Sequence, residues 1–342
     1  MEILNKLQLP NASSGHVTEL DGWRGLAISL VMVSHFFDVK AFHLGSMGVN
    51  LFFALSGLLM ANILFVKRVP LPVFYQRRLS RVFPVFFVFV TLIYLFGHLQ
   101  GAKEPTNYLS TLFFLRSYIG DVGIWKTDLP VGHLWSLNVE EHAYMLLSVL
   151  TLCIRNQRIA GLALGLIGTL SIGIALYYNL HKDELINDAP SLLRRTEANL
   201  ACLMIAGGYA LNKVSLPQPA RALPAISLFL GIMCYSDYAP WHAKTTLAPF
   251  CFAFTVVHLS EASEWFKWIF NRVSLRLVGL WSFSLYLWQQ PFYTFVKSDG
   301  HPLLLSLMGI LLSFFVAIIS FYWLENPTRH FINSWYIKRR AF

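Results

Sequence analysis

The stretch that decides the fold is Asp21-Gly-Trp-Arg-Gly-Leu-Ala-Ile-Ser-Leu-Val-Met-Val-Ser-His-Phe-Phe-Asp38, an apolar segment with a base at one end and an imidazole deep inside. Arg24 and His35 are about three helical turns apart, so they project from nearly one face, roughly 16 Å apart along the axis. Taken alone, Arg24 could extend its side chain to the lipid headgroups, and His35 could be an ordinary packing residue. Because an ionisable side chain facing lipid is costly, two on one face favour a functional track inside the protein.

The composition of the whole chain agrees with this segment. The 342 residues are 56% hydrophobic and 13% charged, whereas soluble domains carry about a quarter charged residues. This composition predicts an all-α, polytopic membrane helix bundle. The net charge of +9 is explained by Lys and Arg in cytoplasmic loops, and no basic–aromatic module predicts a nucleic-acid partner.

The four cysteines lie in or beside apolar runs and form no CxxC pair, which predicts neither a disulfide framework nor a metal site. They are Cys153, Cys202, Cys234 and Cys251. Residues 1–20 lack the apolar core of a signal peptide, so the first helix is expected to remain as an uncleaved anchor.

Apolar runs predict about ten membrane spans, near residues 22–39, 46–66, 82–100, 134–154, 159–179, 192–212, 222–238, 246–261, 275–296 and 303–325. Lys and Arg gather in every second connection, while the opposite loops are neutral or acidic. The positive-inside rule then predicts that both termini are cytoplasmic. The expected organisation is a cytoplasmic N-terminal segment (1–21), a transmembrane domain (22–325) and a basic cytoplasmic tail (326–342).

Two arginines stand out in the basic segment 67–84. Lys67 and Arg68 are typical of a loop that sets membrane topology. Arg78 and Arg81 are three residues apart at the predicted mouth of a helix, where two guanidinium forks could grip one phosphate-bearing ligand. The alternative is that these two also serve only topology.

The span near 134–154 opens with a dense group of polar side chains. Ser136, Glu140 and Tyr144 share one helix face at spacings of four residues. A helix cap explains Ser136, and the membrane interface explains Trp135 and Tyr144. Neither explains Glu140, a carboxylate heading into the bilayer, and this residue is therefore a functional candidate.

Taken together, these motifs resemble the acyltransferase-3 family of bacterial integral-membrane acyltransferases. The matching stretches occur in the family's order: Arg24 with His35, residues 48–57, 74–84, 135–144, 282–291 and 325–327. Two positions depart from the family pattern. Asn50 stands where the family often has Asp, and Gln289 stands where it often has His, so no general-acid role is expected at Gln289.

The resemblance implies transfer of an acyl group, usually acetyl from acetyl-CoA, to a hydroxyl of an extracytoplasmic glycan or glycolipid at the bacterial inner membrane. His35 would be the general base or a transient acyl carrier, and Glu140 would orient it or activate the acceptor hydroxyl. The candidates for the CoA phosphates are Arg24, Arg78 and Arg81. The substrate-binding candidates are Trp135, Ser136, Tyr144 and Gln289. No metal is expected.

Several alternatives remain open from the sequence. Buried His, Glu and Arg could also form the proton relay of a transporter of a glycan-type substrate, and a membrane scaffold would explain the topology alone. Direct transfer and an acyl-histidine route are both compatible with the motifs, as is a homo-oligomer. Acceptors from O-antigen to peptidoglycan would share the same core. The chain ends soon after the tenth span, so any second transfer step is expected to need a partner or not to be used.

Overall fold

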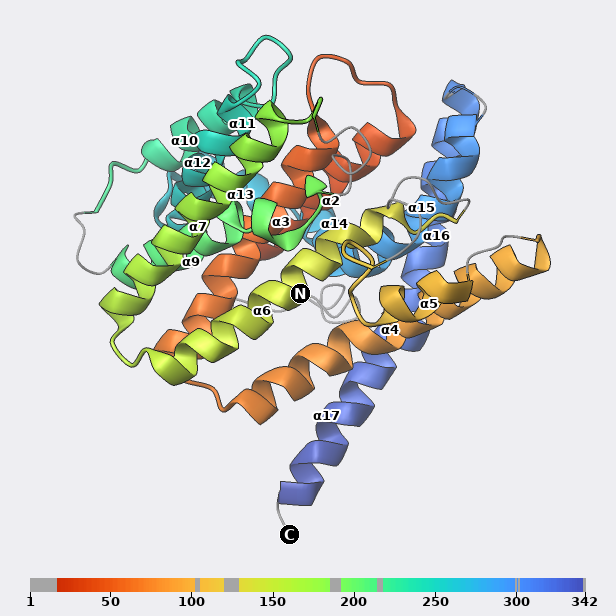
Figure 1. Cartoon of the computed structure of the whole chain (residues 1–342), viewed down its shortest axis with the longest axis horizontal. Coiled ribbons are helices and arrows are strands. Elements are labelled where there is room, and N and C mark those ends of the chain that lie inside the picture. The colour runs from red at the N-terminus through yellow and green to blue at the C-terminus, as the bar shows by residue number, and fades with distance from the viewer. Residues whose placement is uncertain are drawn as a thin grey trace.

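The computed structural model describes residues 17–101, 105–119, 129–184, 192–213, 218–298, 300 and 302–340, without the side chains at 105–106 and 335–340. Over these ranges the chain consists of helices and their connections, which confirms the predicted all-helical class (Figure 1). An isolated bridge pairs Phe42 with Ser236.

The long helices are α2 (Glu19–Phe36), α3 (Leu44–Ala61), α4 (Leu71–Leu99), α6 (Trp135–Cys153), α7 (Gln157–Leu180), α15 (Ser282–Ser298), α16 (Leu303–Ser320) and α17 (Asn326–Arg340). The shorter α-helices are α5 (Pro105–Leu112), α9 (Ala201–Asn212), α10 (Leu223–Met233), α11 (Ala243–Thr246), α12 (Ala248–Val257), α13 (Glu264–Phe270) and α14 (Val273–Leu280). The remaining turns are the 3₁₀ segments η3 (Gly132–Leu134), η4 (Thr196–Ala198) and η6 (Leu259–Glu261), and the π-helical segments η2 (Asn62–Val66) and η7 (Phe321–Glu325).

Within the described ranges, four helical stretches are long and apolar enough to cross a membrane: Leu44–Val66, Leu71–Leu99, Gln157–Leu180 and Leu303–Ser334. Shorter apolar helices at Ala201–Asn212, Leu223–Met233 and Ala243–Val257 accompany them. These features are those of a multi-pass membrane protein. The number of spans and the side of each terminus stay predictions.

Three predicted spans differ from the observed helices. α4 begins at Leu71, eleven residues before the predicted span, so Arg78 and Arg81 lie inside the helix and not at its mouth. The predicted span at 192–212 is an α-helix only over 201–212. The predicted span at 275–296 is divided into α14 and α15, which meet at Trp281.

Small residues bring the central helices into close contact. α3 packs between α9 and α2, and α2 also packs on α14. A Cβ at Gly57 would lie 1.9 Å from the carbonyl oxygen of Leu203 in α9, and one at Gly279 would lie 1.9 Å from that of Asp21. Because only glycine permits such an approach, these positions fix how α2 and α3 sit in the bundle, as is typical of membrane helices.

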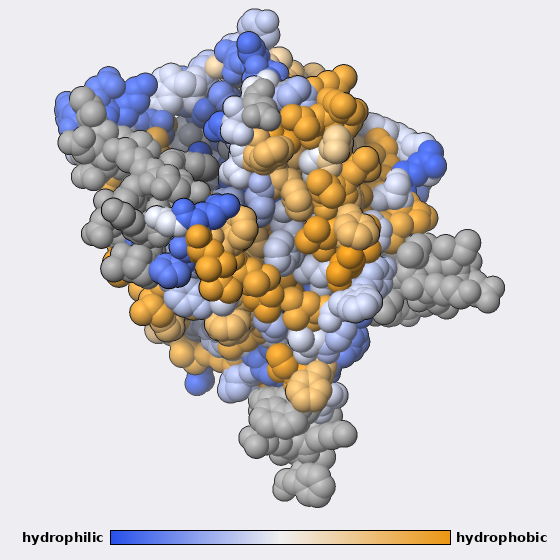
Figure 2. Space-filling model, turned by 90° about the vertical axis from the view of Figure 1, so that its right-hand side faces the viewer, coloured by the Kyte–Doolittle hydropathy of each residue, from blue (hydrophilic) through white to orange (hydrophobic). Residues whose placement is uncertain are grey.

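The outer surface of the bundle is apolar. Leu166 of α7 and Leu311 of α16 are 62% and 69% exposed, and Figure 2 shows hydrophobic side chains spread over much of one face. A soluble protein would gain nothing from such a surface, whereas lipid accommodates it. The polar groups of the candidate site are therefore enclosed by helices whose outer faces suit a bilayer.

Candidate active site

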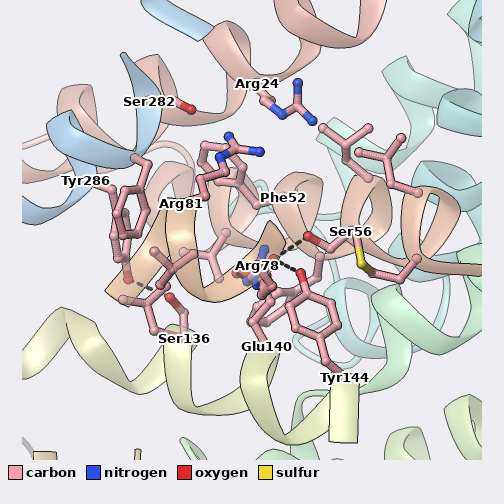
Figure 3. Close-up of a pocket in the computed structure, with 18 residues that line it drawn as sticks. Arg24, Phe52, Ser56, Arg78, Arg81, Ser136, Glu140, Tyr144, Ser282 and Tyr286 are labelled. Atoms are coloured by element: carbon pink, nitrogen blue, oxygen red, sulfur yellow. Dashed lines mark hydrogen bonds and ion pairs between the residues drawn. The ribbon is translucent and has the colours of Figure 1, made fainter. Parts of the chain in front are cut away.

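A cavity of about 110 Å³ lies among α2, α3, α4, α6 and α15, and we call it the arginine cavity. Its polar lining consists of Arg24, Ser56, Arg78, Arg81, Ser136, Glu140, Tyr144, Ser282 and Tyr286 (Figure 3). Three arginines and one carboxylate thus come from three helices that are distant in sequence. The predicted candidates Arg24, Arg78, Arg81, Ser136, Glu140 and Tyr144 are brought together here.

Arg78 and Glu140 form the charged centre of this cavity. Nη2 of Arg78 lies 3.0 Å from Oε2 of Glu140, and its Nε donates to Oε1 of Glu141 at 3.0 Å. The guanidinium also sits 4.1 Å above the ring centroid of Tyr144. Since a buried guanidinium is costly unless it is paired, these contacts hold Arg78 in place and occupy its hydrogen-bonding fork.

The Glu140 carboxylate is fully engaged inside the same cluster. Besides Arg78, it accepts hydrogen bonds from the hydroxyls of Ser56 and Tyr144, so three helices converge on it (Figure 3). The predicted contact between Glu140 and His35 is not among these interactions, because His35 lines a different cavity. Glu140 therefore organises the arginine cavity through Arg78.

Arg24 and Arg81 are held less tightly than Arg78. Nη1 of Arg24 donates to Oδ1 of Asp21 at 3.1 Å, one turn earlier on α2. Arg81 lies close enough to act electrostatically on Arg24, and no hydrogen bond or ion pair holds it within the described chain. The buried Glu325 also acts electrostatically on Arg81 without forming an ion pair with it, so the guanidinium of Arg81 keeps its hydrogen-bond donors for a ligand.

A second cavity, of about 230 Å³, lies farther along α2 and α15, and we call it the histidine cavity. Its lining includes Ser34, His35, His43, Ser46, His133, Trp135, Arg194, Tyr286, Gln290 and Tyr293. The His35 ring stacks on Tyr293 with ring centroids 4.5 Å apart and an interplanar angle of 16°. The side chain of Gln289 lies beside the imidazole without meeting hydrogen-bonding geometry.

Several buried polar atoms around the histidine cavity have no protein partner within the described residues. They are Nδ1 of His35, both ring nitrogens of His133, both amide atoms of Gln289 and Oε1 of Gln290. A buried polar group without a partner costs about 1–3 kcal/mol. A cluster of them in one place is therefore typical of a site that binds a polar ligand or water.

Tyr286 and Val49 line both cavities and form the wall between them. The Tyr286 hydroxyl donates to the backbone carbonyl of His133 and lies 2.6 Å from Oγ of Ser136, which donates to it. Trp135 and Ser136 are neighbours on α6, yet Trp135 lines the histidine cavity and Ser136 the arginine cavity. The hydrogen bonds of Tyr286 on α15 with Ser136 on α6 and with the His133 carbonyl therefore hold the wall in place.

Comparison with known proteins identifies the family. The acyltransferase domain family matches residues 17–325. The chain belongs to this family. The peptidoglycan O-acetyltransferase OatA of Listeria monocytogenes is 25% identical over 94% of the chain and 57% of that protein. The O-acetyltransferase OatA of Staphylococcus aureus is 23% identical over 95% of the chain and 58% of that protein.

The chain thus spans less than three fifths of the length of these curated relatives. No solved structure gives a significant match. Membership of the acyltransferase family confirms the resemblance that the motifs predicted, and residues from several of these motifs line the two cavities on either side of Tyr286.

The sequence singled out four substrate-binding candidates for this acyltransferase, and the structure separates them. Trp135 lines the histidine cavity and Gln289 lies next to it, whereas Ser136 and Tyr144 line the arginine cavity. Tyr144 lies about two and a half turns beyond Trp135 on α6, and its ring packs against Arg78.

Three residues that sequence reasoning did not select also line the site: His133, Tyr286 and Arg194. Tyr286 stands inside the motif stretch 282–291 and His133 lies two residues before the stretch 135–144, so their types and positions were a usable signal. Arg194 stands in a connection between helices, and its approach to the Trp135 ring, 4.6 Å from the centroid, depends on tertiary packing. Glu325 of the closing motif is buried and accepts a hydrogen bond from Ser284 at 2.7 Å.

Proposed function

We propose that the protein is a membrane O-acetyltransferase that takes an acetyl group from acetyl-CoA and transfers it to a hydroxyl of a glycan or glycolipid. The observation that carries the proposal is the pair of cavities separated by Tyr286. One is cationic and lined by Arg24 and Arg81, and the other holds two histidines with buried ring nitrogens that form no hydrogen bond with the described residues. Family membership favours acyl transfer over a proton-coupled transporter.

The arginine cavity suits the donor. The charge on Arg81 could be shared with a CoA phosphate, and Arg24 would add a second guanidinium nearby. The pantetheine arm would then lead towards Tyr286. Arg78 would contribute by holding Glu140 and Tyr144 in place rather than by gripping the phosphate itself, because its fork is already occupied.

The histidine cavity suits the acceptor and the chemistry. His35 would take the proton from the acceptor hydroxyl as the hydroxyl oxygen attacks the thioester carbonyl carbon. The carbon–sulfur bond breaks, and the imidazolium returns the proton to the CoA thiolate. For thioester and hydroxyl to meet, the Tyr286 side chain has to leave the wall or the donor has to pass beside it.

The two cavities also fit the predicted orientation. The arginine cavity is lined near the start of α4, which follows the basic connection with Lys67 and Arg68, and near the starts of α2 and α15. We propose that this end faces the cytoplasm of a bacterium, with the chain in the inner membrane and the acceptor outside. Cysteine labelling in intact cells tests this: a label at position 70 should need membrane permeabilisation, and one at position 41 should not.

The decisive test is transfer itself. Purified protein in proteoliposomes should release CoA from acetyl-CoA and place labelled acetyl on a glycan added on the other side. A protein that binds no acetyl-CoA, or that moves intact glycan across the bilayer without acetylating it, would contradict the proposal and favour the transporter.

A further inference from the structure

A third cavity, of about 210 Å³, adjoins the histidine cavity, and we call it the vestibule. Ser46 and Arg194 line both, so the two spaces are neighbours across these side chains. The vestibule lies where α3 and α9 begin and α7 ends, which is the end of the bundle opposite the basic connections. A molecule reaching the histidine cavity from that side would therefore pass through it.

Three asparagines make the vestibule suitable for a sugar. The amide nitrogens of Asn50, Asn179 and Asn199 already donate to a hydroxyl and to backbone carbonyls at 2.5 to 2.9 Å. Their carbonyl oxygens take part in no hydrogen bond among the described residues and are not sealed from solvent. Amide oxygens are acceptors, so the lining is prepared to receive hydroxyl groups as donors.

Two cationic side chains also lie in the wall of the vestibule. Arg194 and Lys244 both line it and interact electrostatically with each other. Lys244 has no hydrogen bond or ion pair within the described part of the chain. The acidic residue that acts on it, Asp237, has an oxygen 3.2 Å from Nε2 of His43. The ammonium of Lys244 is therefore available to an anion that enters the vestibule.

We propose that the vestibule is the acceptor subsite and that it selects glycans carrying an anionic group, a carboxylate or a phosphate, on or next to the sugar that is acylated. The asparagine oxygens receive the sugar hydroxyls, and Lys244 receives the anion. The aromatic face of Trp135, beneath Arg194, continues the path into the histidine cavity. This inference rests on the proposed function, since it names the class of its acceptor.

The test is equilibrium binding of defined sugars to the purified full-length protein in nanodiscs, without acetyl-CoA. The probes are a glucuronate-containing disaccharide, its neutral methyl ester and the corresponding disaccharide phosphate. The variants are Lys244→Gln, Lys244→Arg and Asn179→Leu. Lys182→Gln is the matched control, because Lys182 is exposed at the end of α7 on the same side of the bundle.

The parent should bind at least one anionic probe about tenfold more tightly than the methyl ester, as expected for one charge-assisted contact. Lys244→Gln should abolish this preference, Lys244→Arg should keep most of it, and Lys182→Gln should leave it intact. Asn179→Leu should weaken the anionic and neutral probes alike. Preference for the glucuronate or for the phosphate tells which anion the acceptor carries.

Two results would overturn the proposal: equal binding of charged and neutral probes by the parent, or a preference that survives Lys244→Gln. Acetyl-CoA binding, measured on the same samples, distinguishes a failure of the vestibule proposal from a failure of the proposed acetyltransferase function. Normal acetyl-CoA binding without anion preference contradicts the vestibule alone, whereas anion preference without acetyl-CoA binding contradicts the acetyltransferase and leaves a glycan-binding membrane protein.

Discussion

The arginine and histidine cavities share a wall and differ in how their polar groups are satisfied. In the arginine cavity, Arg78, Glu140 and Tyr144 bind one another, and the cluster is complete without a ligand. In the histidine cavity, His35 and His133 keep ring nitrogens that bond to no described protein atom. The polar groups of the arginine cavity satisfy one another, whereas polar atoms of the histidine cavity remain available to a ligand or to water.

This difference teaches which substitutions should affect folding and which should affect chemistry. A paired buried charge contributes to the structure around it, so removing one partner destabilises the fold. An unpartnered buried polar atom contributes nothing to folding and costs free energy, so its retention points to a role in binding or proton transfer. Four predictions use this contrast, beginning with the largest expected effect.

His35→Gln should lower acetyl transfer by about 100-fold to 10,000-fold, which is the usual contribution of a general base. Glutamine keeps the approximate size and polarity of the ring but accepts no proton at neutral pH. Acetyl-CoA binding and thermal stability should remain near those of the parent. Activity of the parent should also fall when acidification protonates the imidazole, because a protonated ring accepts no proton.

The matched control is His43→Gln, because His43 lines the same cavity but lies against Asp237 at 3.2 Å. It should retain most of its activity. If His35→Gln transfers acetyl at the parental rate while His133→Gln does not, then the base is the second unpartnered histidine and the assignment to His35 is wrong.

Arg78→Ala should destabilise the protein by about 3–5 kcal/mol, because it leaves two largely enclosed carboxylates, with side chains 18% and 13% exposed, without their partner. From the sequence alone we would expect Arg78→Ala to spare folding, since a helix mouth is exposed. The ion pairs with Glu140 and Glu141 change that expectation. Thermal unfolding in detergent measures the effect, and Arg77→Ala, on an exposed neighbour, is the control.

Unchanged thermal stability of Arg78→Ala would mean that the cluster is not a structural unit. The double variant Arg78→Met with Glu140→Gln sharpens the test, because removing both charges together should cost less than the sum of the single changes. Additive losses would count against a direct interaction between the two side chains.

Arg81→Ala should leave thermal stability near that of the parent and weaken acetyl-CoA binding by about tenfold to a hundredfold, corresponding to one charge-assisted contact of about 1.5–3 kcal/mol. Arg81→Lys should recover part of the loss, since the charge remains and the fork is lost. Titration with labelled acetyl-CoA provides the measurement. Parental affinity in Arg81→Ala would remove this residue from the donor site.

The sequence predicted the helical class and the motif residues well because both depend on local patterns. Helix α7, for example, starts and ends within two residues of its apolar run. The start of α4 was wrong because hydropathy counts Arg78 as a loop residue. Its charge is accommodated by Glu140 and Glu141, which are more than sixty residues away, and no local pattern contains that information.

The division of the site could not be predicted for the same reason. Spacing along α2 placed Arg24 and His35 on one face, but the wall between their cavities comes from Val49 and Tyr286 on other helices. Arg194 enters the site only because the connection before α9 folds back over Trp135. The spacing of residues along the sequence predicts which side chains share a helix face, whereas the way the helices cross decides which faces meet.

Tyr286→Phe should produce the smallest and most specific change, because it removes one hydroxyl from the wall and keeps the ring. That hydroxyl connects α15 with the carbonyl of His133 and with Ser136. A single hydrogen bond is worth about 0.5–1.5 kcal/mol, so the closed position of the ring should be weakened by about twofold to tenfold. The wall should then open more often without an acceptor, and water should reach the thioester.

We therefore expect acetyl-CoA hydrolysis in the absence of glycan to rise by about twofold to tenfold in Tyr286→Phe, with acetyl-CoA affinity unchanged. Release of CoA thiol measures this directly. Tyr209→Phe is the control, because Tyr209 also loses a hydroxyl bond, 2.8 Å to Nε2 of His258, but lines neither cavity. Equal hydrolysis in the parent and in both variants would mean that the Tyr286 hydroxyl does not keep the two cavities apart, and the contrast between them would then need another barrier.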